Sequence, residues 1–319
     1  MRTQIFPSTS ESIGLSNMYK YDRWLVNRFI QFIPDTKGLL SRMDRPAQKY
    51  IRVNTLKITR DELKERLVAK GFVLKDTILM DVFAVQKSPY PLGASIEYLL
   101  GYYYIQDLSS CVAVETLDVK EEHVILDMTS APGGKTTLIA QKMKNRGTII
   151  ACESNLNRIN SILFNTFRCG VFNTLIYRMD ARQVARLDVR FDRVLLDAPC
   201  SCEGIIAKHA ARKTSRQPKD IEYCSSRQKI LIEAGIKAVR PGGILVYCTC
   251  SFAPEENESI ISYVLDKFPV KVEPAGYGTE GLQNFGDCQF RQEIKNTRRL
   301  YPHIHDTLGF YIARLRIMD

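Results

Sequence analysis

Apolar side chains recur at helical spacing near the beginning of the chain. Residues 15–45 place them at about every third or fourth position, which predicts one or two helices, interrupted at Pro34. Residues 48–56 (QKYIRVNTL) show alternating apolar and polar side chains and include β-branched ones, which is typical of a strand. A helix is expected over 59–70, with Thr59 as its N-cap.

A further strand is predicted over 72–85, after Gly71 ends the helix. This strand–helix–strand order indicates a small α+β module, and beyond it apolar strands alternate with helices. The predicted strands are 123–127, 147–153, 174–179, 193–197 and 243–247, and the predicted helices are 136–144, 157–169, 221–239 and 259–268. That alternation predicts an α/β fold with a Rossmann-like, doubly wound parallel sheet, in which ligands bind beyond the carboxyl ends of the strands.

Three parts are expected: an N-terminal helical extension (1–45), the α+β module (46–118) and the α/β domain (119–319). No run of about 18 apolar residues occurs, so no membrane span is predicted. The chain opens without a secretory signal and contains nine cysteines, an odd number, so a cytoplasmic location is expected. The formal net charge of +10 favours a polyanionic partner, and the alternative is a soluble protein that is merely basic.

A glycine-rich turn follows the first strand of the α/β domain. A phosphate-binding P-loop would need glycine at Thr129, and the dinucleotide pattern G-x-G-x-x-G is absent. These exclusions leave a loop of the kind that binds S-adenosylmethionine, because backbone N–H groups of such a turn approach a ligand closely. The residues assigned to it are Ser130, Ala131, Pro132, Gly133, Gly134, Lys135 and Thr136.

Acidic residues end the next strands. Glu153 lies 19 residues after Gly134, where a carboxylate is placed to accept hydrogen bonds from ribose hydroxyls rather than to be a solvated surface acid. Asp180 ends the third strand and is interpreted either as an acceptor for an adenine amino group or as a helix N-cap. Arg158, early in the intervening helix, either orients the site or is a solvated charge.

Two cysteines lie where a ligand is expected. Cys200 follows the fourth strand and Cys250 the fifth, so both are expected at one pocket. Most other cysteines are interpreted as small buried apolar residues: Cys111, Cys152, Cys169, Cys224 and Cys288. The two C-x-C pairs, formed with Cys202 and Cys248, lack the C-x-x-C spacing of zinc knuckles, so no metal is predicted.

A pair of thiols suits methylation of cytosine at carbon 5. That carbon is a poor nucleophile, and a thiolate that adds to carbon 6 makes it enamine-like, which is covalent catalysis. A second cysteine assists release of the adduct. The residues alone leave open which thiol attacks.

Several segments together resemble the RNA cytosine-5 methyltransferases of the Sun/Fmu family, most of all its compact archaeal-type tRNA enzymes. The matching segments run in the family's order: YIRVNTLK (50–57), DMTSAPGGKTT (127–137), ACES (151–154), DAPCSCEG (197–204), YCTCS (247–251), PEENE (254–258) and RRLYPHIHDTLGFYIARL (298–315). They cover residues 45–319, and together they indicate this family far more specifically than any one segment does.

The resemblance implies roles for the matching positions. Cys250 corresponds to the nucleophile and Cys200 to the cysteine needed for product release. Asp197 corresponds to an acid beside the methionine end of the cofactor and the target base, and Lys208 to a basic residue near the active site. The glycine-rich loop, Glu153, Arg158 and Asp180 correspond to the pocket for S-adenosylmethionine. The module over 46–118 resembles an RNA-recognition-like domain, and 119–319 the catalytic domain.

Four positions depart from the family's usual pattern. Thr129-Ser130 stand where Cys-Ala is usual, Cys202 where glycine is usual, and Cys248 where serine is usual. Both Cys200 and Cys250 are retained, and the extra thiols favour oxidation between neighbouring cysteines in vitro.

Segment 208–219 (KHAARKTSRQPK) carries six basic residues, counting His209. We predict a mobile loop that contacts phosphates, rather than merely a solvated charge run. Basic residues near the C-terminus extend this patch: Arg291, Lys295, Arg298 and Arg299. Three consecutive tyrosines, 102–104, either stack on a base or pack in the core.

The expected partner is RNA, with tRNA favoured and rRNA as the alternative, and the expected state is a monomer. Two other classes of function compete. A DNA cytosine-5 enzyme would use Cys200 as its nucleophile, and the pair of cysteines favours RNA over it. A catalytically silent RNA-binding protein of the same fold would bind RNA without methyl transfer.

Overall fold

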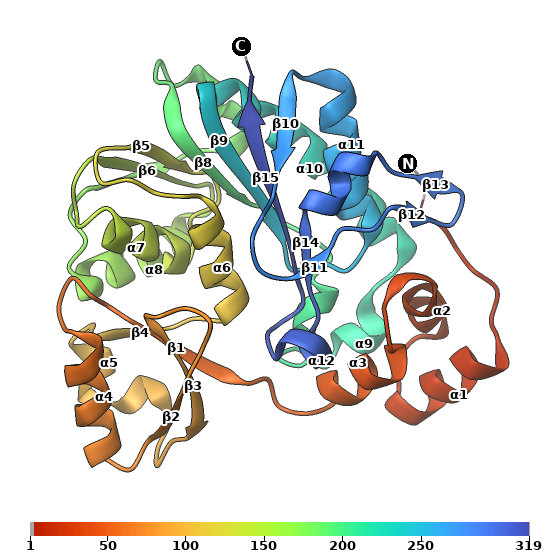
Figure 1. The fold of residues 1–319 in the computed structure, drawn as a ribbon, viewed down its shortest axis with the longest axis horizontal. Coiled ribbons are helices and arrows are strands. Elements are labelled where there is room, and N and C mark those ends of the chain that lie inside the picture. Colours follow the sequence, from red (N-terminus) through yellow and green to blue (C-terminus); the bar gives the residue numbers. More distant parts are fainter. Residues whose placement is uncertain (1–2, 319) are drawn as a thin grey trace. The chain divides into compact units, whose positions relative to one another are not determined.

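The computed structural model describes residues 3–318, which form two compact units (Figure 1). Unit 2 consists of Gln48–Asp197 and Ala234–Val246. Unit 1 is assembled from three separate stretches: the residues up to Ala47, Ala198–Glu233, and the residues from Tyr247 onward. Helix α10 (Pro218–Ala238) and strand β9 (Val239–Thr249) contribute to both units.

Unit 2 begins with a four-stranded antiparallel sheet of order β2-β3-β1-β4. Its elements are β1 (Lys49–Val53), α4 (Arg60–Ala69), β2 (Val73–Asp76), β3 (Val82–Lys87), α5 (Ile96–Leu99) and β4 (Tyr103–Ile105). Thr59 caps α4 as predicted, with a capping box that includes Glu62. The single strand predicted over 72–85 is wrong: the segment is a hairpin, because the Thr77 side chain stabilises a turn by accepting from the backbone N–H of Leu79 and donating to the carbonyl of Val82.

The larger sheet of unit 2 has the strand order β9-β8-β5-β6-β7. Its elements are α6 (Leu108–Thr116), β5 (Val124–Asp127), α7 (Gly134–Lys142), β6 (Thr148–Glu153), α8 (Leu156–Cys169), β7 (Thr174–Arg178) and β8 (Phe191–Asp197). Strands β8, β5, β6 and β7 pair in parallel. The central side chains of β8, β5 and β6 are buried, which explains their nearly continuous apolar runs, whereas those of the edge strand β7 are half-buried or exposed. The predicted Rossmann-like α/β fold is confirmed.

Three polar side chains of the YIRVNTLK segment, buried Arg52 and Asn54 and exposed Lys57, connect the small sheet to α7 and α8. Arg52 donates to the carbonyl of Gly134 and to Thr137 Oγ1, both at 3.0 Å. Asn54 donates to the carbonyls of Gly101 and Cys169, at 2.7 and 2.8 Å. Lys57 donates to two further carbonyls, of Leu100 and Arg168. This segment therefore fixes the architecture of unit 2.

Unit 1 contains the N-terminal helices and the C-terminal antiparallel strands. Its elements are α1 (Ser10–Tyr19), α2 (Arg23–Phe32), α3 (Thr36–Met43), α9 (Arg212–Ser215), α11 (Glu258–Lys267), β10 (Val270–Glu273), β11 (Thr279–Glu280), β12 (Asn284–Phe285), β13 (Cys288–Gln289), β14 (Arg298–Leu300), α12 (Pro302–His305) and β15 (Phe310–Ile317). The expected break at Pro34 is present, and left-handed Lys20 adds a second break that separates α1 from α2. The count of one or two helices was therefore too low.

The antiparallel strands of unit 1 run in the order β11-β14-β15, with β10 paired to the same β15. Apolar side chains of α1–α3 pack with Ile206, Phe252 and Tyr301, so the first residues of the chain share a core with its last third. Two buried ion pairs strengthen this core: Arg28–Glu255 at 2.7 Å and Arg299–Glu258, with an Nε–Oε1 distance of 2.7 Å. Within residues 3–318, no helix is both long and apolar enough to cross a bilayer.

Removal of the buried Arg299 charge is expected to destabilise the protein strongly. Both side chains of the Arg299–Glu258 pair are buried, so Arg299→Met leaves a carboxylate without its counterion. Breaking such a pair costs about 3–5 kcal/mol of unfolding free energy. Urea unfolding measures the loss. Arg291→Met, which removes an exposed ion pair with Asp266, is the matched control. Equal unfolding midpoints for the two variants would contradict this assignment.

Candidate active site

The glycine-rich turn lies between β5 and α7 and is held in place by its neighbours. Ser130 donates from both its backbone N–H and its hydroxyl to the carbonyl of Cys152, and Thr136 donates to buried Asp127 at 2.7 Å. Burial raises the pKa of Asp127 to about 6. Gly133 has a φ of 101°, a left-handed conformation that favours glycine. Buried polar contacts therefore define the shape of this turn.

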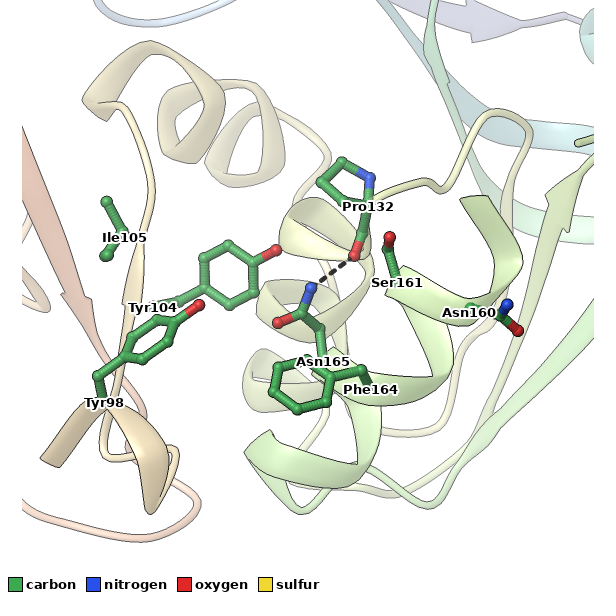
Figure 2. Close-up of a pocket in the computed structure, with 8 residues that line it drawn as sticks. All are labelled: Tyr98, Tyr104, Ile105, Pro132, Asn160, Ser161, Phe164 and Asn165. Atoms are coloured by element: carbon green, nitrogen blue, oxygen red, sulfur yellow. Dashed lines mark hydrogen bonds between the residues drawn. The ribbon is translucent and has the colours of Figure 1, made fainter. Parts of the chain in front are cut away.

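Helix α8 supports the same turn from outside. Arg158 donates to the carbonyl of Ala131 and pairs with Glu153 at 3.3 Å, and Asn165 donates to the carbonyl of Pro132 at 2.9 Å (Figure 2). Glu153 is buried and accepts a hydrogen bond from the backbone N–H of Asn155. Neither Glu153 nor Arg158 is simply a solvated charge.

Four acidic residues follow or end the parallel strands at one edge of the sheet: Asp127, Glu153, Asp180 and Asp197. Asp197 pairs with Lys135 of the turn at 2.6 Å. Asp180 caps the 3-10 helix 181–186 and pairs with Arg182, so the N-cap interpretation is present in the structure. Carboxylates at this edge, beside the glycine turn, fit a ligand that carries hydroxyl and amino donors.

A pocket of about 480 Å³ opens in unit 2, with Pro132 of the glycine-rich turn in its lining (Figure 2). It is lined by Tyr98, Tyr104, Ile105, Pro132, Asn160, Ser161, Phe164 and Asn165. Aromatic rings line it from two sides. Tyr98 lies on α5 and Tyr104 on β4, whereas exposed Phe164 projects from α8. Of the three consecutive tyrosines, Tyr104 lines the pocket, whereas Tyr103 is fully buried and donates to the carbonyl of Leu92.

The two predicted cysteines of unit 1 lie side by side. Their sulfurs, Cys200 Sγ and Cys250 Sγ, are 3.3 Å apart, and Cys202 Sγ is 3.7 Å from Cys200 Sγ. Cys202 has a φ of 65°, which explains why glycine suits this position in the resembling family. Hydrogen bonding with Cys202 and Cys250 raises the pKa of Cys200, because the Cys200 thiol keeps its proton in these contacts. Hydrogen bonding with Cys200 and Cys250, together with the charge of Arg212, lowers the pKa of Cys202. The cluster therefore stabilises one thiolate.

Buried carboxylates of unit 1 hold the two cysteine-bearing turns. Glu256 accepts hydrogen bonds from the backbone N–H of Ser201 at 3.0 Å, from the Ser201 hydroxyl and from Gln228. The Ser251 hydroxyl lies 2.9 Å from Glu256 and 2.7 Å from a second buried acid, Glu203. Ser201 follows Cys200 and Ser251 follows Cys250, so this network sets where both thiols lie.

The PEENE segment (254–258) shapes one of the two cysteine-bearing turns. Asn257 donates to the carbonyl of Ser251 and accepts from Thr249, so it shapes the turn that carries Cys250. A second feature that the sequence did not reveal is the pair Gly204 and Gly309, whose backbones bond at 2.9 Å. A Cβ on Gly204 would lie 2.3 Å from the Gly309 carbonyl oxygen. Neither the contacts of Asn257 nor the approach of the two glycines follows from a periodic pattern in the sequence.

The other predicted residues have mixed surroundings. Lys208, which the resemblance assigns to the neighbourhood of the active site, is exposed. Segment 208–219 is not a loop throughout, because it contains α9 and the start of α10. Lys213 pairs with Asp44 and Arg212 donates to the carbonyl of Ser201, so these charges stabilise unit 1. Arg299 belongs to a buried ion pair, and its assignment to a surface patch was wrong.

The nine cysteines all lie within residues 3–318, and they differ in burial. The expectation of burial is confirmed for Cys111, Cys152 and Cys169, whereas Cys224 and Cys288 are partly exposed.

These features define a Rossmann-like methyltransferase fold with a ferredoxin-like companion domain. Residues 114–316 match the family described as 16S rRNA methyltransferase RsmB/F, and residues 21–86 match the ferredoxin-like domain of RsmF/B-like methyltransferases. The chain belongs to the RsmB/F family of methyltransferases.

Among curated relatives, a mouse 28S rRNA (cytosine-C(5))-methyltransferase is 40% identical over 95% of this chain and 39% of its own length. The chain thus spans about two fifths of that relative. A tRNA (cytosine(49)-C(5))-methyltransferase from Pyrococcus abyssi is 36% identical over 93% of this chain and 96% of its own length.

Two solved structures from Pyrococcus horikoshii share the fold. A methyltransferase homologue has a TM-score of 0.90 and 37% identity, and the match covers 97% of this chain and all of the other. NSun6 with SFG has a TM-score of 0.82 and 27% identity, covering 96% of this chain and 98% of the other.

Ionisation of Glu256 is expected to make stability depend on pH. Burial, and then the charge of Glu203, raises the pKa of Glu256 from 4.5 to about 8. The folded state then binds more protons than the unfolded state between these values, so stability falls as pH rises from about 4.5 to about 8, and levels off above. Glu256→Gln, which resembles the protonated acid, should flatten this profile.

Urea unfolding of both proteins across that pH range measures the effect. Glu122→Gln, at an exposed carboxyl, controls for the loss of one charge. A Glu256→Gln profile as steep as that of the natural protein would show that this carboxyl is not the group responsible.

Proposed function

We propose that this protein methylates carbon 5 of cytosine in RNA, with S-adenosylmethionine as methyl donor, Cys250 as nucleophile and Cys200 as the residue that releases the product. The observation that carries the proposal is the 3.3 Å separation of the two sulfurs, on turns that follow β8 and β9. Two thiols in contact suit a reaction in which one forms a covalent adduct and the other assists its release. Names of the relatives, both tRNA and rRNA cytosine-C5 methyltransferases, agree with this chemistry.

The residues of unit 2 fit S-adenosylmethionine. Glu153 would accept hydrogen bonds from the ribose hydroxyls and Asp180 from the adenine amino group, while the Ser130–Thr136 turn would lie along the rest of the molecule. Asp197, which pairs with Lys135, is assigned to the methionine end. The relative with SFG, an S-adenosylmethionine analogue, supports this choice. When bound, this cofactor supplies an electrophilic methyl group to carbon 5.

The cysteines act on the base. The Cys250 thiolate forms a bond to carbon 6, and the displaced electron pair moves to carbon 5, which becomes nucleophilic. After carbon 5 is methylated and loses its proton, the bond between carbon 6 and sulfur breaks and the thiolate is regenerated. Cys200 is close enough to exchange a proton with Cys250 during this release. A cytoplasmic, reducing environment belongs to the proposal, because it keeps such close thiols from joining.

Transfer RNA is the proposed substrate, because the tRNA relative matches this chain along nearly the whole length of both proteins. Ribosomal RNA is the second candidate, because the mouse rRNA relative is 40% identical. The pocket of Figure 2 is proposed to take an unpaired base other than the target. Tyr98, Tyr104 and Phe164 offer rings for stacking, and Asn160 and Ser161 offer polar groups at its edge.

A trapping assay distinguishes the two cysteines. The natural protein, Cys200→Ala and Cys250→Ala are each mixed with S-adenosylmethionine and unmodified tRNA, then separated on a denaturing gel. We expect Cys200→Ala alone to accumulate a covalent protein–RNA adduct, because it can add to carbon 6 but releases the product poorly. An adduct with Cys250→Ala instead would reverse the two roles.

The same assay tests the class of function and the substrate. Methyl transfer to rRNA but not to tRNA would select the second candidate. Transfer to DNA would support a DNA enzyme. RNA binding without transfer to any of these substrates would indicate the silent RNA-binding alternative.

RNA binding should separate stacking from charge. Phe164→Ala should weaken tRNA binding at least about fivefold with an unchanged salt dependence, because a stacked base contributes about 1–3 kcal/mol. The double variant Lys208→Ala, Lys219→Ala, at two exposed lysines, should instead flatten the plot of affinity against salt. Phe172→Ala removes an exposed ring outside the pocket and serves as control. If Phe172→Ala weakens tRNA binding as much as Phe164→Ala does, the pocket is not the site at which a base stacks.

A further inference from the structure

A third thiol lies beside the two proposed catalytic cysteines. Cys202 Sγ is 3.7 Å from Cys200 Sγ, and the three sulfurs of Cys200, Cys202 and Cys250 all lie within 4.8 Å of one another. All three are partly exposed, so ions in solution can reach them. The sequence offers only C-x-C pairs, and the fold adds a sulfur from a segment about fifty residues away.

We propose that Cys200, Cys202 and Cys250 bind a thiophilic divalent cation, zinc or cadmium, which blocks the two catalytic thiols. The blocking of catalysis rests on the function proposed above, whereas the binding of the cation does not.

The spacing of the sulfurs suits such a cation. Zinc binds thiolates at about 2.3 Å in tetrahedral geometry, which places sulfurs about 3.8 Å apart. The separations of 3.3 Å, 3.7 Å and at most 4.8 Å bracket that value. Three protein ligands leave a fourth position for water. Binding replaces the thiol protons with metal–sulfur bonds and releases those protons to solvent, with no change of oxidation state.

Cys202 is the residue that makes the site distinctive. Two neighbouring thiols bind a cation less tightly than three, and the third comes from a position with a left-handed backbone, where glycine would be unstrained. Cys202→Gly therefore removes one ligand, relieves strain in the turn and leaves Cys200 and Cys250 in place. It is the variant that separates the proposed metal site from the proposed catalytic pair.

Cadmium titration of the reduced protein without RNA tests the binding. Formation of cadmium–thiolate bonds gives an ultraviolet charge-transfer absorption, and thiol counts before and after exclude oxidation. We expect one cation for each chain, an affinity reduced at least about tenfold in Cys202→Gly, and an unchanged affinity in Cys224→Ser, which removes a partly exposed thiol elsewhere. Equal affinity in the natural protein and Cys202→Gly would overturn the proposal. So would loss of binding in Cys224→Ser.

Inhibition is measured separately, with each variant compared with its own metal-free rate. Zinc should inhibit methyl transfer by the natural protein, a chelator should restore it, and Cys202→Gly should require at least about tenfold more zinc. Equal sensitivity of the two proteins would overturn the blocking role. If no protein transfers methyl groups, the proposed function fails while the cadmium titration still decides the metal site.

Discussion

The Glu256 carboxyl is the point on which the arrangement of the thiols depends. It is buried and bonds to the segments that follow both cysteines, through Ser201 on one side and Ser251 on the other. Desolvation makes a charged carboxylate costly there, so its protonated form is favoured, and the hydrogen bonds of two turns converge on one group. Cysteine side chains have no comparable means of holding themselves in contact.

In unit 2 as well, the side chains that support the site differ from those placed to contact a ligand. The side chains that would meet a ligand, such as Glu153, lie at strand ends, whereas the shape of the glycine turn depends on Asp127, Arg158 and Asn165 behind it. Arg52 extends this support to the small sheet, because its guanidinium reaches the first turn of α7. The small sheet is thus part of the framework of the turn.

Periodicity and motif spacing predicted much of this molecule. The parallel strands, the capped helix α4 and the close approach of Cys200 and Cys250 follow from local patterns and from the rule that ligands meet strand ends. The hairpin at Thr77, the burial of Arg299 and the third sulfur of Cys202 do not. The burial of Arg299 depends on a distant partner, Glu258, and the cluster that Cys202 joins depends on the approach of Cys250. The hairpin depends on a local turn at Thr77, and apolar periodicity carries none of this information.

Unit 1 is discontinuous in the chain, and this has a consequence for biosynthesis. Helices α1–α3 are synthesised before the rest of unit 1. Arg28 therefore lacks its partner Glu255, and the apolar faces of α2 and α3 lack Phe252 and Tyr301, until those residues are made. Most of unit 2 is one continuous stretch, Gln48–Asp197, so most of its residues are available to pack together sooner. During translation, about two hundred residues therefore emerge while α1–α3 lack the surface that buries them, and their apolar side chains stay exposed over that interval.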